Sequence, residues 1–360
     1  MHYFKPHKNL KKQPNSIVSL LFLTSTLLLL FLSFSLTGCR QDANQRPETA
    51  ESPIIPSLTL TSVPTNTPIP EVFNSERAFS DVAYQLSLGA RTVGSPAHEK
   101  VGDWIIAELN KAGWQVETQN STFQGKPVRN IIGKLTLSSK ASPWVILGAH
   151  YDSRLLADHD PDIQKRTQPV LGANDGASGV AVLLELARTI PGQLEAVGTG
   201  TAIPSNMPHA GSIWLLFIDN EDNGNIPGWD WLMGSRAFVN NLNQKPDAVI
   251  IIDMIGDKDL NIKYETNSNP IMNQEIWSQA AKLGYSQEFL ERPGFSMIDD
   301  HTPFLEAGIP AVDLIDFDYP YYHTTADTID KINAHSLKVI GDTLTAWLLN
   351  GSAIFKSSRP

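Results

Sequence analysis

The sequence predicts an α/β fold: a single domain with a central mixed, mostly parallel β-sheet flanked by helices. Apolar runs of strand length alternate with segments of helical periodicity, an order typical of parallel sheets covered by helices. Two of these runs, 213–218 and 248–252, are continuous and rich in β-branched residues, as expected for strands buried on both faces. With 41% hydrophobic and 18% charged residues in 360, the chain is not of the disordered, collagen-like or coiled-coil class.

The first 38 residues are expected to be a signal peptide. Residues 1–12 hold four Lys and no acidic residue, and the stretch 17–36 is almost continuously apolar or hydroxylic, which is the order found in secretory signals. The stretch is also close to the length of a membrane span, so an uncleaved anchor is the alternative. The sequence Leu36-Thr37-Gly38-Cys39 favours the signal peptide, because it resembles a bacterial lipobox, in which the cysteine is lipidated and becomes the mature N-terminus.

Residues 39–73 are expected to form the lipidated cysteine and a disordered tether. The stretch 47–70 contains six Pro, five Thr and three Ser and has no Lys, Arg or aromatic residue, so it buries too little apolar surface to offset the entropy of ordering its backbone. The remaining residues, 74–360, are enough for one large α/β domain. The protein is therefore expected to be exported, anchored to the bacterial cell envelope through lipid on Cys39, and monomeric.

Charge and cysteine content exclude further kinds of protein. The net charge of the chain is −10, which argues against a nucleic-acid partner, since such proteins carry a basic patch or stripe. Cys39 is the only cysteine, so the chain can form no intrachain disulfide and no cysteine-based zinc site.

The first half of the domain is expected to begin with two helices, 75–89 and 97–112. In the second helix Val101, Ile105 and Leu109 fall on one face. Three apolar runs of strand length follow, and then a helix that is apolar nearly all round and therefore buried. These four elements are expected at 114–123, 128–137, 144–149 and 177–190.

The second half of the domain continues the alternation of strands and helices. Strands are expected at 213–218, 248–252 and 310–315, and helices at 271–283 and 336–350. The stretches 153–170 and 196–210 are rich in Pro, Gly and polar residues, so we expect surface loops there.

Acidic and histidine side chains gather around the ends of the predicted strands. They fall in five segments, at His150 and Asp152, at Asp175, at Glu221 and Asp222, at Asp253, and at Asp299 to His301 together with His323. In open α/β sheets the ligand site lies beyond the carboxyl ends of the strands. Because ionised acids are rarely buried without a partner, so many acids at this edge require a cation.

The available ligands indicate which cation is expected. Histidine together with carboxylates at a catalytic site suits zinc, and in Glu221-Asp222 one residue can bind the metal while its neighbour acts as a base. Taken singly, His150 could be a core histidine and Asp253 a strand cap, so the functional interpretation depends on the ordered set. The remaining histidines of the domain, His98, His159, His209 and His335, are expected to be solvated or capping groups.

The order of these motifs resembles the zinc-aminopeptidase superfamily that also contains the glutaminyl cyclases. The resemblance covers roughly 75–355 and implies the fold predicted above, a zinc cofactor, and an enzyme that acts on the N-termini of peptides or proteins. Seven motifs carry it: His150 to Ser153, Gly172 to Gly179, Glu221-Asp222, Gly234-Ser235, Asp253 to Gly256, Asp300 to Phe304 and Tyr322 to Thr324.

The resemblance also implies which residues bind metal. Asp175, Asp222 and His323 would hold one zinc ion. In an aminopeptidase, His150 and Asp253 would hold a second ion, with Asp175 as the bridge. Cyclases keep both residues without a second metal, so the ligands do not separate the two branches.

Three features favour a glutaminyl-peptide cyclotransferase, which converts N-terminal Gln to pyroglutamate and releases ammonia. The first is an insert after Glu221 that contains Trp229, in the place where cyclases carry a substrate-facing Trp. The second is the pair Asp299-Asp300, which resembles the double Asp of the cyclases. The third is Ser153-Arg154, which resembles the cyclase form of the first motif. Tyr322 points the other way, since cyclases have Trp there. A di-zinc aminopeptidase that hydrolyses N-terminal residues remains the alternative, and a non-catalytic tethered binding protein is a third interpretation.

In the cyclase interpretation Glu221 is the base, and Asp299 and Asp253 hold the proton network around it. Trp229 and Tyr322 are expected to contact the substrate. Members of the resembled family have a cis peptide bond directly after the aspartate that matches Asp175, so a cis bond is expected between Asp175 and Gly176.

Overall fold

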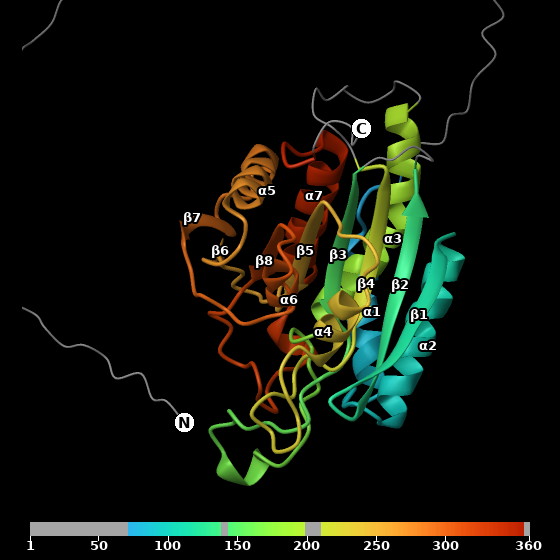
Figure 1. The fold of residues 1–360 in the computed structure, drawn as a ribbon. Helices are drawn as coiled ribbons and strands as arrows, with labels where there is room; N and C mark the ends of the chain where they lie inside the picture. Colours follow the sequence, from blue (N-terminus) through green and yellow to red (C-terminus); the bar gives the residue numbers. More distant parts are fainter. Residues whose placement is uncertain (1–70, 138–142, 199–209, 356–360) are drawn as a thin grey trace, which may run out of the picture. The chain divides into compact units, whose positions relative to one another are not determined.

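The computed structural model describes residues 71–137, 143–198 and 210–355 (Figure 1). The predicted signal peptide, nearly all of the predicted tether, Cys39 and His209 lie outside the described residues, so the predictions made for them stay predictions. In the part of the chain that is described, no helix is long and apolar enough to span a membrane.

A six-stranded sheet forms the centre of the domain, in the order β1-β2-β4-β3-β5-β8. Its strands are β1 (Gln115–Phe123), β2 (Lys126–Thr136), β3 (Trp144–His150), β4 (Ser212–Ile218), β5 (Ala248–Asp253) and β8 (Ala311–Ile315). β2 pairs antiparallel with β1 and with β4, whereas β4, β3, β5 and β8 are joined by parallel pairings. The predicted α/β fold with a mixed, mostly parallel sheet is confirmed.

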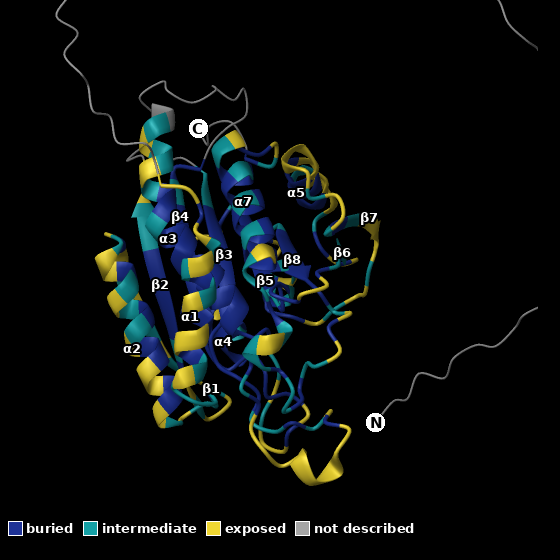
Figure 2. Cartoon of the chain, turned by 180° about the vertical axis from the view of Figure 1, so that it is seen from behind, coloured by how far each residue is buried: buried dark blue, intermediate teal, exposed yellow. Residues whose placement is uncertain are grey.

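Helices cover both faces of this sheet (Figures 1 and 2). One face is covered by α1 (Ser75–Ser87), α2 (Pro96–Lys111), α3 (Ala177–Gly198) and α7 (Ala334–Asn350), with α5 (Pro270–Leu283) packed against α7. The other face is covered by the short helices α4 (Met233–Asn240) and α6 (Thr302–Glu306). The sheet is therefore the middle layer of three.

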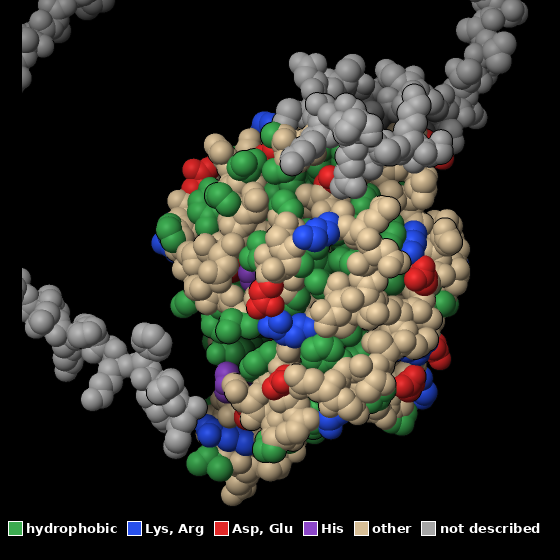
Figure 3. Space-filling view, in the orientation of Figure 1, with side chains coloured by type: hydrophobic (Ala, Val, Ile, Leu, Met, Phe, Trp, Pro, Cys, Tyr) green, Lys and Arg blue, Asp and Glu red, His purple; other side chains and the backbone are tan. Residues whose placement is uncertain are grey.

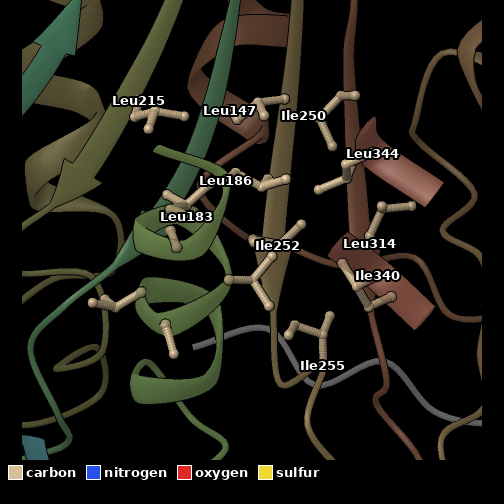
Figure 4. Close-up of a cluster of buried hydrophobic side chains, with 14 of the residues drawn as sticks. Leu147, Leu183, Leu186, Leu215, Ile250, Ile252, Ile255, Leu314, Ile340 and Leu344 are labelled. Atoms are coloured by element: carbon tan, nitrogen blue, oxygen red, sulfur yellow. The ribbon is translucent and has the colours of Figure 1, made fainter. Parts of the chain in front are cut away.

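Alternation along the central strands explains why their sequences are apolar throughout. Leu147 and Ile250 point into the larger core, where they meet side chains of α3 and α7 such as Leu183 and Ile340 (Figure 4). Ile146, which precedes Leu147 in β3, points into the smaller core under α4 and α6. Because both faces are covered, the strands are apolar along most of their length, and polar residues such as His150 and Asp253 stand at their carboxyl ends.

The structure differs from the predicted elements mainly in short segments. α4, α6 and the two strands of a small parallel sheet, β6 (Ile262–Tyr264) and β7 (Phe289–Pro293), were not expected. α4 begins after Leu232, whose backbone is left-handed and whose side chain provides no cap, so the sequence holds no start signal of the usual kind. α3 continues through Pro191, where the prediction ended it.

Candidate active site

The segments that hold the predicted site residues meet at one end of the sheet. The loops that follow β3, β4, β5 and β8 gather at the bottom of Figure 1. The turn with Asp175 directly precedes α3 and reaches the same end. The sheet topology thus brings together residues that are up to 173 positions apart, from 150 to 323.

Asp175, Asp222 and His323 form the first group that could hold a metal ion. Nε2 of His323 lies 2.9 Å from Oδ1 of Asp222 and 3.7 Å from Oδ2 of Asp175. All three residues are buried. This is the ligand set predicted for one zinc ion.

His150, Asp175 and Asp253 form a second such group. Nε2 of His150 lies 3.1 Å from Oδ1 of Asp253 and 3.3 Å from Oδ1 of Asp175. Since Oδ2 of Asp175 faces His323, the two oxygens of this one carboxylate face different groups. Asp175 is therefore shared by both groups.

The residues present fit zinc. Ligand atoms about 2.0–2.1 Å from a tetrahedral zinc ion lie about 3.3 Å from one another, and the separations in both groups, 2.9–3.7 Å, bracket that value. Oδ2 of Asp222 is also buried without a hydrogen-bond partner. A carboxylate oxygen with unused capacity beside an imidazole nitrogen is what a zinc site requires.

The expected cis bond between Asp175 and Gly176 is wrong: the described residues contain no cis peptide bond. Gly176 instead has a φ of +91°, in the left-handed region that glycine enters at little cost. A Cβ at this position would lie 2.7 Å from the main-chain oxygen of Asp152. The turn is made by the glycine backbone, and the Asp175 carboxylate still faces both groups.

The backbone is strained on either side of the proposed ligands. Asn220, Met254 and His323 are non-glycine residues with φ values of +55°, +47° and +56°. Asn220 precedes Glu221, Met254 follows Asp253, and His323 is itself a ligand candidate. Such conformations cost about 1–3 kcal/mol each and concentrate at functional sites.

A cavity of about 220 Å³ opens beside the two groups. Glu221, Asp253 and Asp299, the predicted catalytic residues, all lie on its wall. Burial, and then the neighbouring Asp222, raise the pKa of Glu221 well above its ordinary value. Burial raises the pKa of Asp253 to about 7 although His150 lowers it. A cation bound at the groups would favour the ionised carboxylates and lower these pKa values.

A second layer of buried polar residues lies behind Asp299. Asp313 is fully buried in β8, and burial followed by the charge of Asp299 raises its pKa well above the ordinary value. His301 lies between Asp313 and Glu265, with nitrogen-to-oxygen distances of 3.7 and 3.2 Å. Asp313 and Glu265 were not predicted, although an acid inside the apolar run 311–315 is a signal that could have marked Asp313.

The tryptophan on the cavity wall is Trp231 and not Trp229. The Trp231 ring lies 5.9 Å from the ring of His323, nearly parallel to it, and the Arg154 guanidinium lies 5.0 Å from its centre. Trp229 is half-buried under the ammonium group of Lys126. Tyr322, the other predicted substrate contact, does line the cavity.

The lining of the cavity includes both apolar and polar side chains. Met297, Ile298 and Phe317 are apolar lining residues, and Ile298 is 69% exposed. Figure 3 shows apolar side chains gathered beside a histidine on the left of this face. Asp158 and His159 are polar lining residues.

His98 is not solvated, because it is 4% exposed; its Nδ1 accepts a hydrogen bond from the N–H of Gly94 just before α2, at 3.4 Å, so the capping part of the prediction holds. Its Nε2 lies 2.7 Å from Oδ1 of Asp219, and its ring stacks on Tyr151. Asp219 opens the segment that holds Glu221 and Asp222, so this buried pair fixes the end of β4. His335 and His159 are both exposed, as expected, and His159 also lines the cavity.

The chain is similar to several known proteins. A model of peptidase family M28 matches residues 130–348. The glutaminyl-peptide cyclotransferase of Drosophila melanogaster is 27% identical over 278 residues, which are 68% of this chain and 72% of that protein.

Two solved structures are also similar to the chain. Tannerella forsythia glutaminyl cyclase matches with a TM-score of 0.67 and 31% identity, over 76% of this chain and 97% of that chain. A Zn-dependent exopeptidase from Parabacteroides distasonis matches with a TM-score of 0.66 and 30% identity, over 77% of this chain and 98% of that chain. The relatives thus include both a cyclase and an exopeptidase.

Proposed function

The chain belongs to peptidase family M28, and we propose that its activity is that of a zinc-dependent glutaminyl-peptide cyclotransferase, which closes the N-terminal glutamine of a peptide or protein to pyroglutamate. The observation that carries this proposal is the placement of Glu221, Asp299 and Trp231 around one cavity beside the first metal-binding group. At about 220 Å³ the cavity is smaller than most ligand pockets, which suits a single terminal residue. The relatives named as glutaminyl cyclases support the same activity.

Asp175, Asp222 and His323 are the proposed zinc ligands. A zinc ion there would supply Lewis-acid polarisation of the γ-carbonyl of the substrate glutamine. His150 and Asp253, with Asp175, are the residues that would hold a second ion.

Glu221 is the proposed base. It accepts a proton from the substrate's α-amine as the amine nitrogen bonds to the carbonyl carbon of the side-chain amide, and it returns a proton to the amide nitrogen as the bond between that carbon and the amide nitrogen breaks and ammonia leaves. Because both reacting groups belong to one residue, holding that residue in a reactive conformation supplies much of the rate. We propose that Asp299 and Asp253 hold the proton network around Glu221, and that Trp231 and Tyr322 contact the substrate.

A di-zinc aminopeptidase is the second candidate. It is favoured by the second group of possible metal ligands, in which His150, Asp175 and Asp253 are all present. Tyr322 in place of Trp and the similarity to a Zn-dependent exopeptidase also favour it. In that reaction Glu221 would take a proton from the attacking water and give one to the departing amine. The same residues thus serve either reaction, and the products decide between them.

We also propose that residues 1–38 are removed on export, and that lipid on Cys39 and the tether 39–73 hold a monomeric catalytic domain, 74–360, at the outer side of the cytoplasmic membrane or beyond it. The basis is the sequence: the basic and apolar order of the leader, the lipobox-like Leu36 to Cys39, and the Pro- and Thr-rich tether.

The decisive experiment incubates the zinc-loaded protein side by side with a peptide that begins with Gln and one that begins with Leu. Pyroglutamyl product with equimolar ammonia from the first supports the cyclase, and free leucine from the second supports the aminopeptidase. Asp222→Asn is the matched control, since it should lose both zinc and activity. Absence of both products from fully zinc-loaded protein would favour the non-catalytic binding protein.

A further inference from the structure

Arg91 is buried completely although it lies outside every segment of the proposed site. It stands in the turn between α1 and α2, and 0% of its surface is exposed. A charged side chain is rarely buried unless other groups compensate it. The contacts of Arg91 therefore indicate what it does.

The guanidinium of Arg91 donates three hydrogen bonds, all to main-chain carbonyl oxygens. Nε donates to Tyr151 at 3.1 Å, Nη1 to Leu171 at 2.6 Å and Nη2 to Gly172 at 2.8 Å. The carbonyl oxygen of Arg91 in turn accepts from the N–H of Ser153 at 3.2 Å. One side chain thus joins the segment after β3 to the turn before α3.

Each of the two joined segments holds a proposed metal ligand. Tyr151 directly follows His150, and Gly172 lies three residues before Asp175. Gly172 has a φ of +66°, and a Cβ there would lie 2.5 Å from the main-chain oxygen of Asp175 and 2.9 Å from Nη2 of Arg91. The turn is therefore packed tightly between the guanidinium and the ligand.

The charge of Arg91 also faces the site. Burial lowers its pKa to about 10, and the nearby carboxylates of Asp327, Asp152 and Asp175 raise it, so it remains a cation at neutral pH. Asp327 accepts from the N–H of Asp175 at 3.1 Å, and Asp152 accepts from the N–H of Glu221 at 3.1 Å. The buried charge of Arg91 thus lies among three acids. Asp175 is a proposed metal ligand, and Asp327 and Asp152 hold the main chain of Asp175 and of Glu221.

We propose that Arg91 is a positioning residue that fixes the spacing of His150 and Asp175 and thereby sets the affinity of the site for metal. This role rests on the metal site proposed above. Outer partners of metal ligands typically contribute about 10- to 100-fold in metal affinity. Arg91 touches neither the substrate cavity nor the ligand side chains, so its effect acts through the two loops.

The test measures the zinc dissociation constant of the purified mature protein by competition with a chromogenic chelator. Arg91→Met removes the three donors and the charge, and we expect zinc binding about 10- to 100-fold weaker than in the wild type. Arg91→Lys keeps the charge but cannot reach three carbonyl groups, so a smaller loss is expected. Arg188→Met is the matched control, because Arg188 is also largely buried but pairs with Asp81, Glu108 and Glu185 on the helices.

A thermal melt of each metal-free protein separates positioning from general stability. Arg188→Met should lower the melting temperature and leave the zinc dissociation constant unchanged. Zinc affinity of Arg91→Met within twofold of the wild type would overturn the proposal, as would an equal loss of affinity in Arg188→Met. If Arg91→Met does not fold, wild-type affinity in Arg91→Lys overturns it instead. A wild-type protein that binds no zinc would refute the proposed metal site itself.

Discussion

Replacing Glu221 by glutamine tests the proton acceptor directly. The residue is 8% exposed, lies on the cavity wall, and donates its main-chain N–H to Oδ1 of Asp152 at 3.1 Å. Glutamine has the same shape, so this hydrogen bond and the adjacent ligand Asp222 should stay in place. Loss of a general base typically costs 10²- to 10⁴-fold in rate, or about 2.7–5.4 kcal/mol of transition-state free energy. We expect that loss in kcat, with zinc content unchanged.

The variant should also change the dependence of activity on pH. Glu221 accepts a proton only when it is ionised, and burial followed by the charge of Asp222 raises its pKa. The activity of the wild type should therefore fall as the pH drops through the raised pKa, to the extent that bound zinc leaves it raised. Glutamine does not titrate, so the residual activity of the variant should lack this acidic limb.

The assay follows ammonia release from a peptide that begins with Gln, or leucine release if the protein is an aminopeptidase, alongside zinc content by mass spectrometry. Glu306→Gln is the control: its carboxylate is exposed and pairs with Arg236, so that variant should keep wild-type kcat. The assignment would be refuted by a Glu221→Gln protein with full zinc content and activity within tenfold of the wild type. Asp299 would then be the next candidate for the base.

Three further predictions concern the cavity, the backbone and the anchor. Trp231→Ala should raise KM about tenfold, equivalent to about 1.4 kcal/mol, whereas Trp229→Ala should leave KM near the wild-type value. If steady-state kinetics show the larger KM for Trp229→Ala, Trp229 is the residue that contacts the substrate, as the sequence predicted. Gly234→Ala should lower the free energy of unfolding in urea by about 1–3 kcal/mol or more, because its Cβ would lie 1.8 Å from the main-chain oxygen of Asp219; an unchanged midpoint would contradict this. Cys39→Ser should move active protein from the membrane to the soluble fraction, and retention on the membrane would indicate an uncleaved anchor.

The sequence predicted the long elements, and it did so most closely for the central strands that are covered on both faces. The strand expected at 213–218 is found at Ser212–Ile218, and the strand expected at 248–252 at Ala248–Asp253, because burial on both faces leaves an unbroken apolar run. α6 spans only five residues and β6 three, which is too short for either periodicity to show. Their positions are set by contacts with the sheet and with neighbouring segments.

The sequence located the proposed ligands but not the orientation of the side chains around them. Ligand types and order could be read because Asp175 lies just before α3, Asp222 lies just after β4, and His323 lies in the loop that follows β8. Trp229 and Trp231 lie only two residues apart in one loop, and which ring faces the cavity is decided by Lys126 over one and Arg154 beside the other. Such long-range partners leave no trace in local sequence.

The shared position of Asp175 makes the two metal-binding groups one thermodynamic system. Each of its oxygens faces a different histidine, so an ion bound in one group would fix the rotamer and the charge that the other group presents. The two occupancies would then be linked by a coupling free energy, which is the same whichever ion binds first. The number of zinc ions bound per protein would follow from that coupling and the free zinc concentration together. A complete set of ligands for two ions is compatible with a protein that works with one.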